Sequence, residues 1–560
     1  MTRDFYGIDL GTSNSTISSI DEHGQPKPFQ VGQGESYMLP SVVYYPENRD
    51  PVVGDKAKNT VIAFPSRCVQ HIKREMGNPD YHRQIDGRDL KPEDVSAEIL
   101  KKLVSQANKR KEENGEAPVY NVVVSIPAQF GHNERQRTIK AVELAGLKLI
   151  SLVHEPTAAA LSFGVKKQDN KTFIVYDLGG GTFDVNVMRV GENHLKILAK
   201  GGDLHCGGID WDTAIVRMGL RGLNKASSNE LLRSNESFES FLRGNDGQSM
   251  LASAESVKID LCDPDNEGDS AFTFRFEDKL ETVIINQDEF FDNTNPLVLR
   301  TIQKTEEVIR EAGIKDLEKE IDEIIMVGGS SYMPQIESAI RNAFKIKNVH
   351  RQEPGLAISK GAAIYAELLI TEGDWADTIG SEVKDRANAP RPEFSPQTTA
   401  VLPQEESTRT PDKTPTTIAK KPRFSTKVTN HTPAVTIEEI GGQSYGICYA
   451  DRGHYYIYNL ISKSDPLVLK RVFEQFVTKL PNQRFIDLDI REYESNTLIL
   501  RECNVKSRRV APNARLILSR AVPVGTKIAI EVSRDRNGVI HMSANCVGSK
   551  IDIEIKTEVS

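Results

Sequence analysis

The tripeptide Asp-Leu-Gly occurs twice in this 560-residue chain, each time directly after a short apolar run. Asp9 begins the first copy, and Asp177 begins the second, 168 residues further on. Small and hydroxyl-bearing residues follow each copy and lead into another strand-like run. We interpret each as a strand, a glycine turn and a strand, because glycines let backbone N–H groups approach an anion without a Cβ in the way. Two matching hairpins predict two similar lobes that face each other across one nucleotide.

The residues of these turns suit phosphoryl chemistry. A carboxylate at a strand end can hold a hydrated Mg²⁺, which prefers oxygen ligands and keeps several waters. Asp9 and Asp177 can therefore face one metal ion and the β- and γ-phosphates from opposite sides, while Thr12, Ser13 and Thr182 supply hydroxyl donors. Phosphoryl transfer needs mainly such positioning and charge neutralisation. Either copy alone is equally consistent with an ordinary turn, and the matched context of the two favours a nucleotide site.

A third glycine turn follows the strand-like run that ends at Val327 and comprises Gly328, Gly329 and Ser330. Backbone at such a turn can approach a ribose or a flat base closely, so it is a candidate for the adenosine end. The chain has no Gly-x-x-x-x-Gly-Lys-Ser/Thr motif and no Gly-x-Gly-x-x-Gly that opens a helix. The predicted site is therefore neither a P-loop nor a dinucleotide-binding crossover.

Composition and charge exclude several classes of protein. The net charge of −8 implies no general attraction to nucleic acid, and no apolar run approaches the ~20 residues that span a bilayer. The N-terminus has no basic-then-apolar leader, and the cysteines are scattered without a Cys-x-x-Cys pair. We therefore expect a soluble cytoplasmic protein without nucleic-acid or membrane partners.

The hydrophobic pattern divides the chain into three parts. Residues 1–370 alternate strand-like and helix-like segments, which is typical of an α/β layer architecture. Residues 371–434 are rich in Pro and Thr and poor in apolar residues, which predicts a disordered linker. Residues 435–560 alternate apolar and polar residues with a period of two, which predicts an all-β domain. The predicted elements are strands at 119–126, 321–327, 455–461 and 484–490, helices at 93–107, 133–145 and 354–369, and a hairpin around Asn537-Gly538.

Four segments of the first part together resemble one family. They are Gly7 to Ser15, His154 to Ala160, Tyr176 to Val185 and Gly202 to Asp210. Their order and residues are similar to those of the actin, sugar-kinase and heat-shock superfamily, and within it to the seventy-kilodalton heat-shock (Hsp70) chaperones. The resemblance implies a two-lobed ATPase fold at 1–370, followed by a linker and an all-β sandwich that binds peptides.

The resemblance also implies roles for individual residues. Asp9, Glu155 and Asp177 would surround the hydrated Mg²⁺, and Lys73 would reach the γ-phosphate of ATP. The implied catalytic residues are Asp9, Lys73, Glu155, Asp177 and Thr182. The implied ATP- and ADP-binding residues are Gly11, Thr12, Ser13, Asn14, Gly179, Gly180, Gly181, Gly207, Gly208, Glu255, Lys258, Gly328, Gly329 and Ser330. Pro127, Arg135 and Glu155 stand where the family couples the nucleotide state to the second domain.

Several features depart from the family pattern. The family's short acidic and leucine-rich linker is replaced by the Pro/Thr-rich stretch, and we expect no helical lid after the β domain. Tyr332 stands where an arginine is common near the adenine, and Gly355 stands where an aspartate is common. Ser151 stands where many members carry the arginine that receives a J-domain co-chaperone, so the resemblance does not extend to that partner.

The sequence leaves more than one function open. The first is a lidless ATP-dependent chaperone that hydrolyses ATP and binds extended, unfolded polypeptide segments, with a nucleotide-exchange factor as a further partner. The alternative is a regulator or scaffold that binds nucleotide and a dedicated protein partner. A small-molecule kinase and a filament-forming protein on the same core fold are further alternatives, but the kinase gives no role to the attached β domain.

Overall fold

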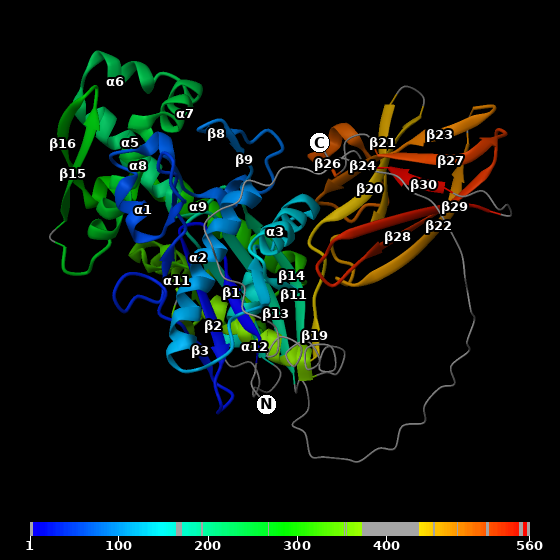
Figure 1. Ribbon diagram of the computed structural model, residues 1–560, viewed down its shortest axis with the longest axis horizontal. Helices are drawn as coiled ribbons and strands as arrows, with labels where there is room; N and C mark the ends of the chain where they lie inside the picture. Colours follow the sequence, from blue (N-terminus) through cyan, green and yellow to red (C-terminus); the bar gives the residue numbers. More distant parts are fainter. Residues whose placement is uncertain are drawn as a thin grey trace.

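The computed structural model describes residues 4–163, 171–191, 194–266, 268–351, 353, 355–371, 436–451, 454–478, 480–510, 514–547 and 553–556. The chain forms a larger α/β part and a smaller all-β part that lie side by side (Figure 1). This arrangement confirms the predicted fold class. Apart from Thr371, the predicted linker lies outside the described residues and stays a prediction. Within the described residues, no helix is long and apolar enough to cross a membrane.

The first lobe is built on a mixed sheet that contains the first Asp-Leu-Gly turn. Its strand order is β11-β10-β1-β2-β3, and β4 also pairs with β2. β1 is antiparallel to β2 and parallel to β10, so a hairpin is joined to a parallel crossover strand. The strands are β1 (Tyr6–Asp9), β2 (Asn14–Ile20), β3 (Pro26–Pro28), β4 (Leu39–Pro40), β10 (Asn121–Ile126) and β11 (Lys148–His154).

The second lobe repeats this pattern around the second Asp-Leu-Gly turn. Its strand order is β18-β17-β12-β13-β14-β19, with β12 antiparallel to β13 and parallel to β17. The same sequence signature thus produces the same local topology in both lobes. The strands are β12 (Lys171–Leu178), β13 (Phe183–Gly191), β14 (His194–Asp203), β17 (Glu323–Val327), β18 (Val349–Arg351) and β19 (Thr436–Glu438).

Two helices rich in small residues, α4 (Glu155–Ser162) and α12 (Ala357–Thr371), join the lobes. Their side chains share one hydrophobic core with residues of both sheets. The backbones approach so closely that a Cβ on Gly361 would lie 1.7 Å from the carbonyl oxygen of Ala158, and a Cβ on Gly7 would lie 2.1 Å from the backbone nitrogen of Ala363. The small residues are therefore required by packing, and α12 lies where the sequence predicts a helix.

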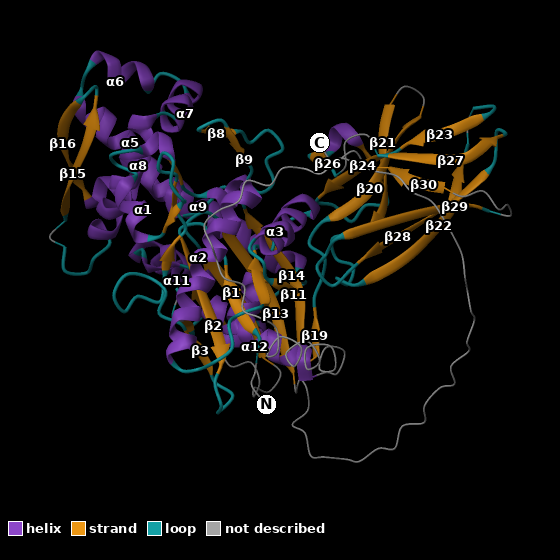
Figure 2. Ribbon diagram, in the orientation of Figure 1, coloured by secondary structure: helices purple, strands orange, loops and turns teal. Residues whose placement is uncertain are grey.

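The remaining helices and short strands surround the two sheets, and α6, α7 and the β15–β16 hairpin lie away from both sheets at one end of the second lobe (Figure 2). The predicted helix at 93–107 extends to Glu113, and the one at 133–145 is found as α3. On the first lobe the elements are α1 (Asp55–Thr60), α2 (Pro92–Glu113), α3 (His132–Leu144), η1 (Pro65–Arg67), η2 (Ile72–Glu75), β5 (Val43–Tyr44), β6 (Val52–Val53), β7 (Cys68–Val69), β8 (Arg83–Ile85) and β9 (Arg88–Leu90). On the second they are α5 (Gly208–Leu223), α6 (Ala226–Leu231), α7 (Asn235–Arg243), α8 (Asn245–Leu261), α9 (Gln287–Glu311), α10 (Leu317–Glu320), α11 (Pro334–Phe344), η4 (Gly329–Tyr332), β15 (Asp269–Phe276) and β16 (Lys279–Asn286).

The all-β part, strands β20 to β30, is called the β domain below. Its sheets have the strand orders β25-β21-β20-β24-β26, β22-β28-β29 and β23-β27-β30 around one core. The strands are β20 (Ser444–Asp451), β21 (His454–Ile461), β22 (Leu469–Val477), β23 (Gln483–Asp487), β24 (Asp489–Tyr493), β25 (Ile499–Arg501), β26 (Ser507–Arg509), β27 (Arg515–Val522), β28 (Lys527–Arg534), β29 (Ile540–Cys546) and β30 (Ile553–Lys556), with η5 at Glu502–Asn504.

One predicted strand of the β domain is wrong and one predicted hairpin is right. The run at 484–490 forms two strands, because the chain passes from one sheet to another at Leu488. The hairpin of β28 and β29 turns at Asn537-Gly538, where Gly538 has a φ of 74° that favours glycine.

Candidate nucleotide site and its contact with the β domain

The two Asp-Leu-Gly turns touch each other between the lobes. A Cβ on Gly180 would lie 2.1 Å from Ser13 Oγ, and one on Gly181 would lie 2.6 Å from Thr12 Oγ1. Within the second turn, the amide of Gly179 donates to the carbonyl of Thr182 at 3.0 Å. The structure therefore brings together the hydroxyls and glycines of both turns, as two hairpins facing one anion require.

Three buried carboxyl groups lie beneath these turns, on Glu155, Asp177 and Asp184, and the half-buried carboxyl of Asp9 lies beside them. Lys73 lies among them and forms an ion pair with Glu155, which begins α4. Asp9 Oδ1 accepts a hydrogen bond of 2.8 Å from Ser125. The structure thus gathers the implied metal and catalytic residues, and Lys73 is a buried member of the cluster.

Asp184 is a member of this cluster that the sequence analysis missed. It lies directly opposite Asp177 in the antiparallel register of β12 and β13, and its Oδ1 accepts from the amide of Ala128 at 2.8 Å. The sequence contains a signal for it, because Asp184 follows the glycine turn at the distance that puts it opposite Asp177 in a hairpin. Arg74 was missed too; it donates to the carbonyl of Gly181 at 2.7 Å and to Asp210 at 2.5 Å.

The electrostatics of this cluster follow from burial and from like charges. Burial raises the pKa of Asp177 well above its usual value, and the neighbouring Glu155, Asp184 and Asp9 raise it further. Burial and Glu155 likewise raise the pKa of Asp184 to about 8. Burial alone would lower the pKa of Lys73. The neighbouring carboxylates of Glu155 and Asp9 have the larger effect, so the pKa of Lys73 is raised. The cluster therefore has more carboxyl groups than its one lysine can balance, so without a further cation Asp177 and Asp184 favour the protonated form.

These residues fit a hydrated divalent cation. Asp177 Oδ2 is buried and has no hydrogen-bond partner in the structure, and such an unsatisfied oxygen is costly. A cation with its water shell would supply donors to this oxygen and neutralise the carboxylates. Among the described residues, no three acidic, imidazole or thiol groups are placed to ligate a metal ion directly. The fit is thus to an ion held through water.

The third glycine turn lies against the second. Gly328 has a φ of 81°, and a Cβ there would lie 2.3 Å from the carbonyl oxygen of Leu178. A Cβ on Gly208 would lie 2.5 Å from Ser330 Oγ and 3.0 Å from Lys258 Nζ, whereas one on Gly329 would meet open space. The implied nucleoside residues therefore converge beside the phosphate turns.

Other implied residues lie around this end of the site. Glu255 forms an ion pair of 2.6 Å with Lys58, which belongs to the first lobe, so this contact bridges the lobes. The exposed Tyr332 ends the third turn, and the guanidinium of Arg351 lies 5.3 Å from its ring centroid. Gly11, Asn14 and Gly207 form the backbone of the phosphate turns, and a Cβ on Gly207 would lie 2.4 Å from the carbonyl carbon of Gly181.

The strand that leads into the β domain belongs to the sheet of the second lobe. The sequence analysis assigns residues from 435 onward to the β domain, but β19 pairs in parallel with β14, His194 opposite Thr436. The edge of β14 offers unpaired backbone donors and acceptors, and an incoming extended segment satisfies them without needing a leucine run.

Glu439, the residue after β19, reaches the start of helix α4. Its buried carboxylate accepts from His154 Nδ1 at 3.0 Å and from the hydroxyl of Thr157 at 2.7 Å. His154 Nε2 lies 2.7 Å from Arg135 Nη2 and 3.1 Å from Lys200 Nζ. Since the guanidinium of Arg135 can only donate and the carboxylate of Glu439 can only accept, Nε2 accepts and Nδ1 carries the proton. Burial and Lys200 lower the pKa of His154 to about 4, so it is neutral at pH 7.

The β domain contacts the first lobe at two further places, beside α3 and β11 (Figure 1). At the β28–β29 turn, Asn537 accepts from Arg135 Nη1 at 2.8 Å through its carbonyl and from the amide of Leu152 at 3.0 Å through Oδ1. At β26, Arg508 donates to both carboxylate oxygens of Glu134 at 2.5 and 2.6 Å and to Glu492 at 2.5 Å. Nothing local in the sequence marks Arg508 or Glu439 as interface residues.

A comparison with protein families gives a match to the model described as Hsp70 protein, over residues 5–86 and 78–444. The chain belongs to the Hsp70 family. The match covers both lobes, β19 and the first residue of β20, so it includes the connection between the nucleotide site and the β domain.

Two curated relatives of this Hsp70-family chain are named chaperone protein DnaK. The protein of Deinococcus proteolyticus is 28% identical over 472 residues, which cover 78% of this chain and 69% of the relative. That of Deinococcus deserti is 29% identical over 419 residues, which cover 69% and 64%. The chain thus spans about two-thirds of the length of these relatives. Hsp70-family proteins are nucleotide-binding chaperones, generally with Mg²⁺.

The raised pKa of Asp184 predicts how stability depends on pH. The folded protein holds a proton on this carboxyl that the unfolded chain loses near pH 4, so stability falls as pH rises from about 4 to about 8. We expect Asp184→Asn, which keeps the oxygen that binds Ala128, to weaken this decline and to raise the melting temperature at pH 8 by about 2–4 °C without nucleotide or metal. Calorimetry at pH 6 and 8 measures it. The exposed Asp50→Asn serves as the control, and equal slopes in all three proteins contradict the prediction.

The contacts of Arg508 predict that it holds the β domain against the first lobe. Arg508→Ala leaves the buried carboxylates of Glu134 and Glu492 without their cation, which favours separation of the domains. We expect backbone amide exchange in residues 436–439 to become about tenfold faster, measured by hydrogen–deuterium exchange mass spectrometry. Arg509→Ala is the matched control, because Arg509 pairs with Asp489 inside the β domain. Unchanged exchange in the Arg508 variant would refute this role.

Proposed function

We propose that this chain is an ATP-dependent chaperone that hydrolyses ATP slowly and binds extended polypeptide in its β domain, with an affinity set by the nucleotide. One observation carries the proposal. Glu439, on the segment that enters the β domain, is bonded to His154, and the next residue, Glu155, is the ion-pair partner of Lys73. The nucleotide site and the β domain are thus connected through adjacent residues of one strand–helix junction.

In the ATPase reaction each residue has a role that its position supports. Asp9, Glu155 and Asp177 would hold the hydrated Mg²⁺, which when bound supplies charge neutralisation to the β- and γ-phosphates. Lys73 would position the γ-phosphate, with Thr12, Ser13 and Thr182 donating to phosphate oxygens. Asp177 or Asp9 would orient the attacking water through its carboxylate.

Coupling between the domains would begin at Lys73. A γ-phosphate competes with Glu155 for this lysine, so nucleotide binding changes the partner of a residue adjacent to His154. A ligand shifts a conformational equilibrium only if it interacts differently with the two states, and this exchange of partners supplies such a difference. Release of phosphate would restore the Lys73–Glu155 pair.

The β domain offers aromatic side chains for a peptide. The rings of Tyr449 and Tyr456 stack with centroids 5.8 Å apart, and Tyr458 lies 6.2 Å from Phe473 and 6.3 Å from Phe476. All five are only partly buried. Among the described strands, β22 pairs with β28 alone, so its other edge is available to an extended chain. We propose unfolded polypeptides as clients of this aromatic surface and strand edge.

The exposed residues of the ATPase lobes support a nucleotide-exchange factor as a partner better than a J-domain co-chaperone. A nucleotide-exchange factor would find the exposed Leu280 and Ile284 on the β15–β16 hairpin of the second lobe. Ser151 is fully buried and its hydroxyl donates to the carbonyl of Leu152 at 3.0 Å, so it offers nothing to a J-domain.

The ATPase assignment predicts the effect of two substitutions. Asp177→Asn and Thr182→Ala each remove a group placed at the phosphates, and we expect each to lower single-turnover ATP hydrolysis about 10²-fold. Thr282→Ala, on the exposed β15–β16 hairpin, is the control and retains the native rate. Native turnover in both site variants would remove the assignment.

Peptide affinity tests the coupling. We expect an unfolded peptide to bind more weakly with ATP than with ADP, by about tenfold, and Phe473→Ala to weaken binding in both states. Fluorescence anisotropy with a labelled peptide measures this. Equal affinity with ATP and ADP supports the alternative function, a nucleotide-binding scaffold with a dedicated partner.

A further inference from the structure

Lys200, near the end of β14, is a buried lysine that pairs with no carboxylate among the described residues. Its side chain is only 6% exposed. Its amine nitrogen has one hydrogen-bond partner in that part of the chain, His154 Nε2 at 3.1 Å, and Arg135 already donates to the same atom at 2.7 Å. A charged ammonium group has three protons to donate. One shared acceptor therefore suits the neutral amine better than the ammonium ion.

The neighbouring strand offers Lys200 no further acceptor. Asn186 of β13 lies directly opposite it in the antiparallel register. Both amide atoms of Asn186 are buried without a hydrogen-bond partner, so the lysine is not bonded to this amide and reaches His154 of the first lobe instead. The two lobes thus leave the amine poorly satisfied.

The segment that enters the β domain covers Lys200. Gly442 has a φ of 85°, and a Cβ on it would lie 2.3 Å from Cε and 3.0 Å from Nζ of the lysine. Glu439, on the same segment, and Arg534 of β28 act on the amine electrostatically. We call the arrangement in the structure, with the β domain against the lobes, the docked state. Separation of the β domain would remove these residues and open Lys200 to water.

The groups around Lys200 oppose a further positive charge. The charged and titratable side chains that face it are Arg135 from α3, His154 from β11, Asp184 from β13, Glu439 after β19 and Arg534 from β28. Burial, together with Arg135 and Arg534, lowers the pKa of Lys200 well below its usual value, and Glu439 and Asp184 offset only part of this effect. The electrostatics thus agree with the hydrogen bonding.

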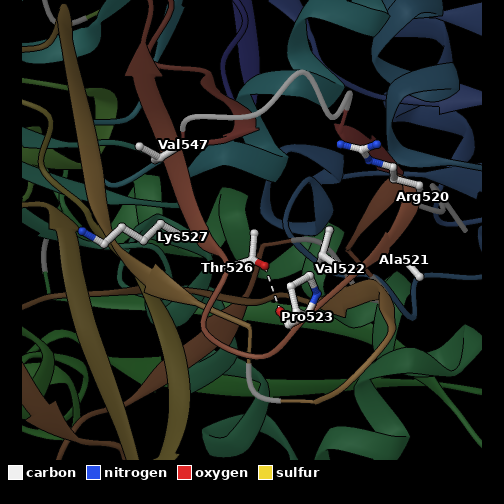
Figure 3. A pocket seen from close by; sticks show the side chains of 7 residues that line it. All are labelled: Arg520, Ala521, Val522, Pro523, Thr526, Lys527 and Val547. Atoms are coloured by element: carbon white, nitrogen blue, oxygen red, sulfur yellow. Dashed lines mark hydrogen bonds between the residues drawn. The ribbon is translucent and has the colours of Figure 1, made fainter.

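Other cations without an ion-pair partner among the described residues remain in contact with water. Arg520 and Lys527 border a hollow of about 450 Å³ in the β domain, where Figure 3 shows their side chains, and both are exposed. Lys200 differs from them because the position of the β domain decides whether its amine is buried or hydrated.

We propose that docking of the β domain is coupled to a proton through Lys200: the docked state holds this residue as a neutral amine, and separation of the domains lets it take up a proton from water. The separated state then binds one proton more than the docked state. Docking therefore becomes more favourable as pH rises toward the usual lysine pKa of about 10.4, by up to about tenfold in the docking constant for each pH unit. Acidification favours separation. The coupling concerns the chain without nucleotide, so it does not depend on the proposed ATPase activity.

Amide exchange on the full chain without nucleotide tests this coupling. The protection of residues 436–439, divided by the intrinsic exchange rate at each pH, measures the docking constant. We expect it to rise at least tenfold between pH 7 and pH 9, by hydrogen–deuterium exchange mass spectrometry. Because Asp184 has a pKa of about 8, the series is repeated with Asp184→Asn, and the rise should remain. A docking constant independent of pH overturns the proposal.

Variants of Lys200 decide whether this residue carries the proton. Lys200→Met and Lys200→Gln have no titrating group, and we expect both to dock with a constant that does not change with pH. Lys200→Arg keeps its charge and should dock at least tenfold more weakly than the native chain at pH 9. Lys527→Met, which removes an exposed cation, is the control and should keep the native dependence on pH.

Two results with these variants overturn the proposal. The native dependence on pH in both neutral variants assigns the proton to another group. Loss of docking at every pH in both neutral variants, with native circular dichroism, shows that the amine serves only as a hydrogen-bond donor to His154.

Discussion

The charged groups gathered around the buried Lys73 are the main physical constraint on how the two lobes fit together. Four carboxyl groups from strands and helices of both lobes surround this lysine, and Glu155 pairs with it. A buried arrangement of this kind stores electrostatic repulsion unless a cation or a proton relieves it. The fold can hold it because the two sheets and the helices α4 and α12 form a closely packed frame behind the site, with backbones in contact at glycine.

The same frame places the carboxyl cluster next to a contact with the β domain. Helix α4 begins with Glu155 in the nucleotide site, while His154 and Thr157 beside it bind Glu439. The contacts of Arg508 and Asn537 with the first lobe attach the β domain to the same lobe.

Whether the sequence predicts a contact depends on how far apart the two residues lie along the chain. The strands, turns and glycines around Asp9 and Asp177 are local, so pattern and spacing predict them. Lys73 contacts Glu155 and Arg508 contacts Glu134 across long stretches of chain, and no periodicity encodes such pairs. The resemblance to a family predicted the place of Lys73 in the site. The interface roles of Arg508 and Glu439 could be identified only from the structure.

The parallel pairing of β19 with β14 has a consequence for the order in which the protein forms. The sheet of the second lobe gains its last strand only when residues 436–438 have been synthesised, long after His194 has emerged. Until then the lobe has a bare strand edge, and such edges recruit other extended chains. Pairing at so large a sequence separation is slow to form. The nascent chain is thus itself exposed to the misassociation that chaperones prevent, and it becomes protected when its own last strand arrives.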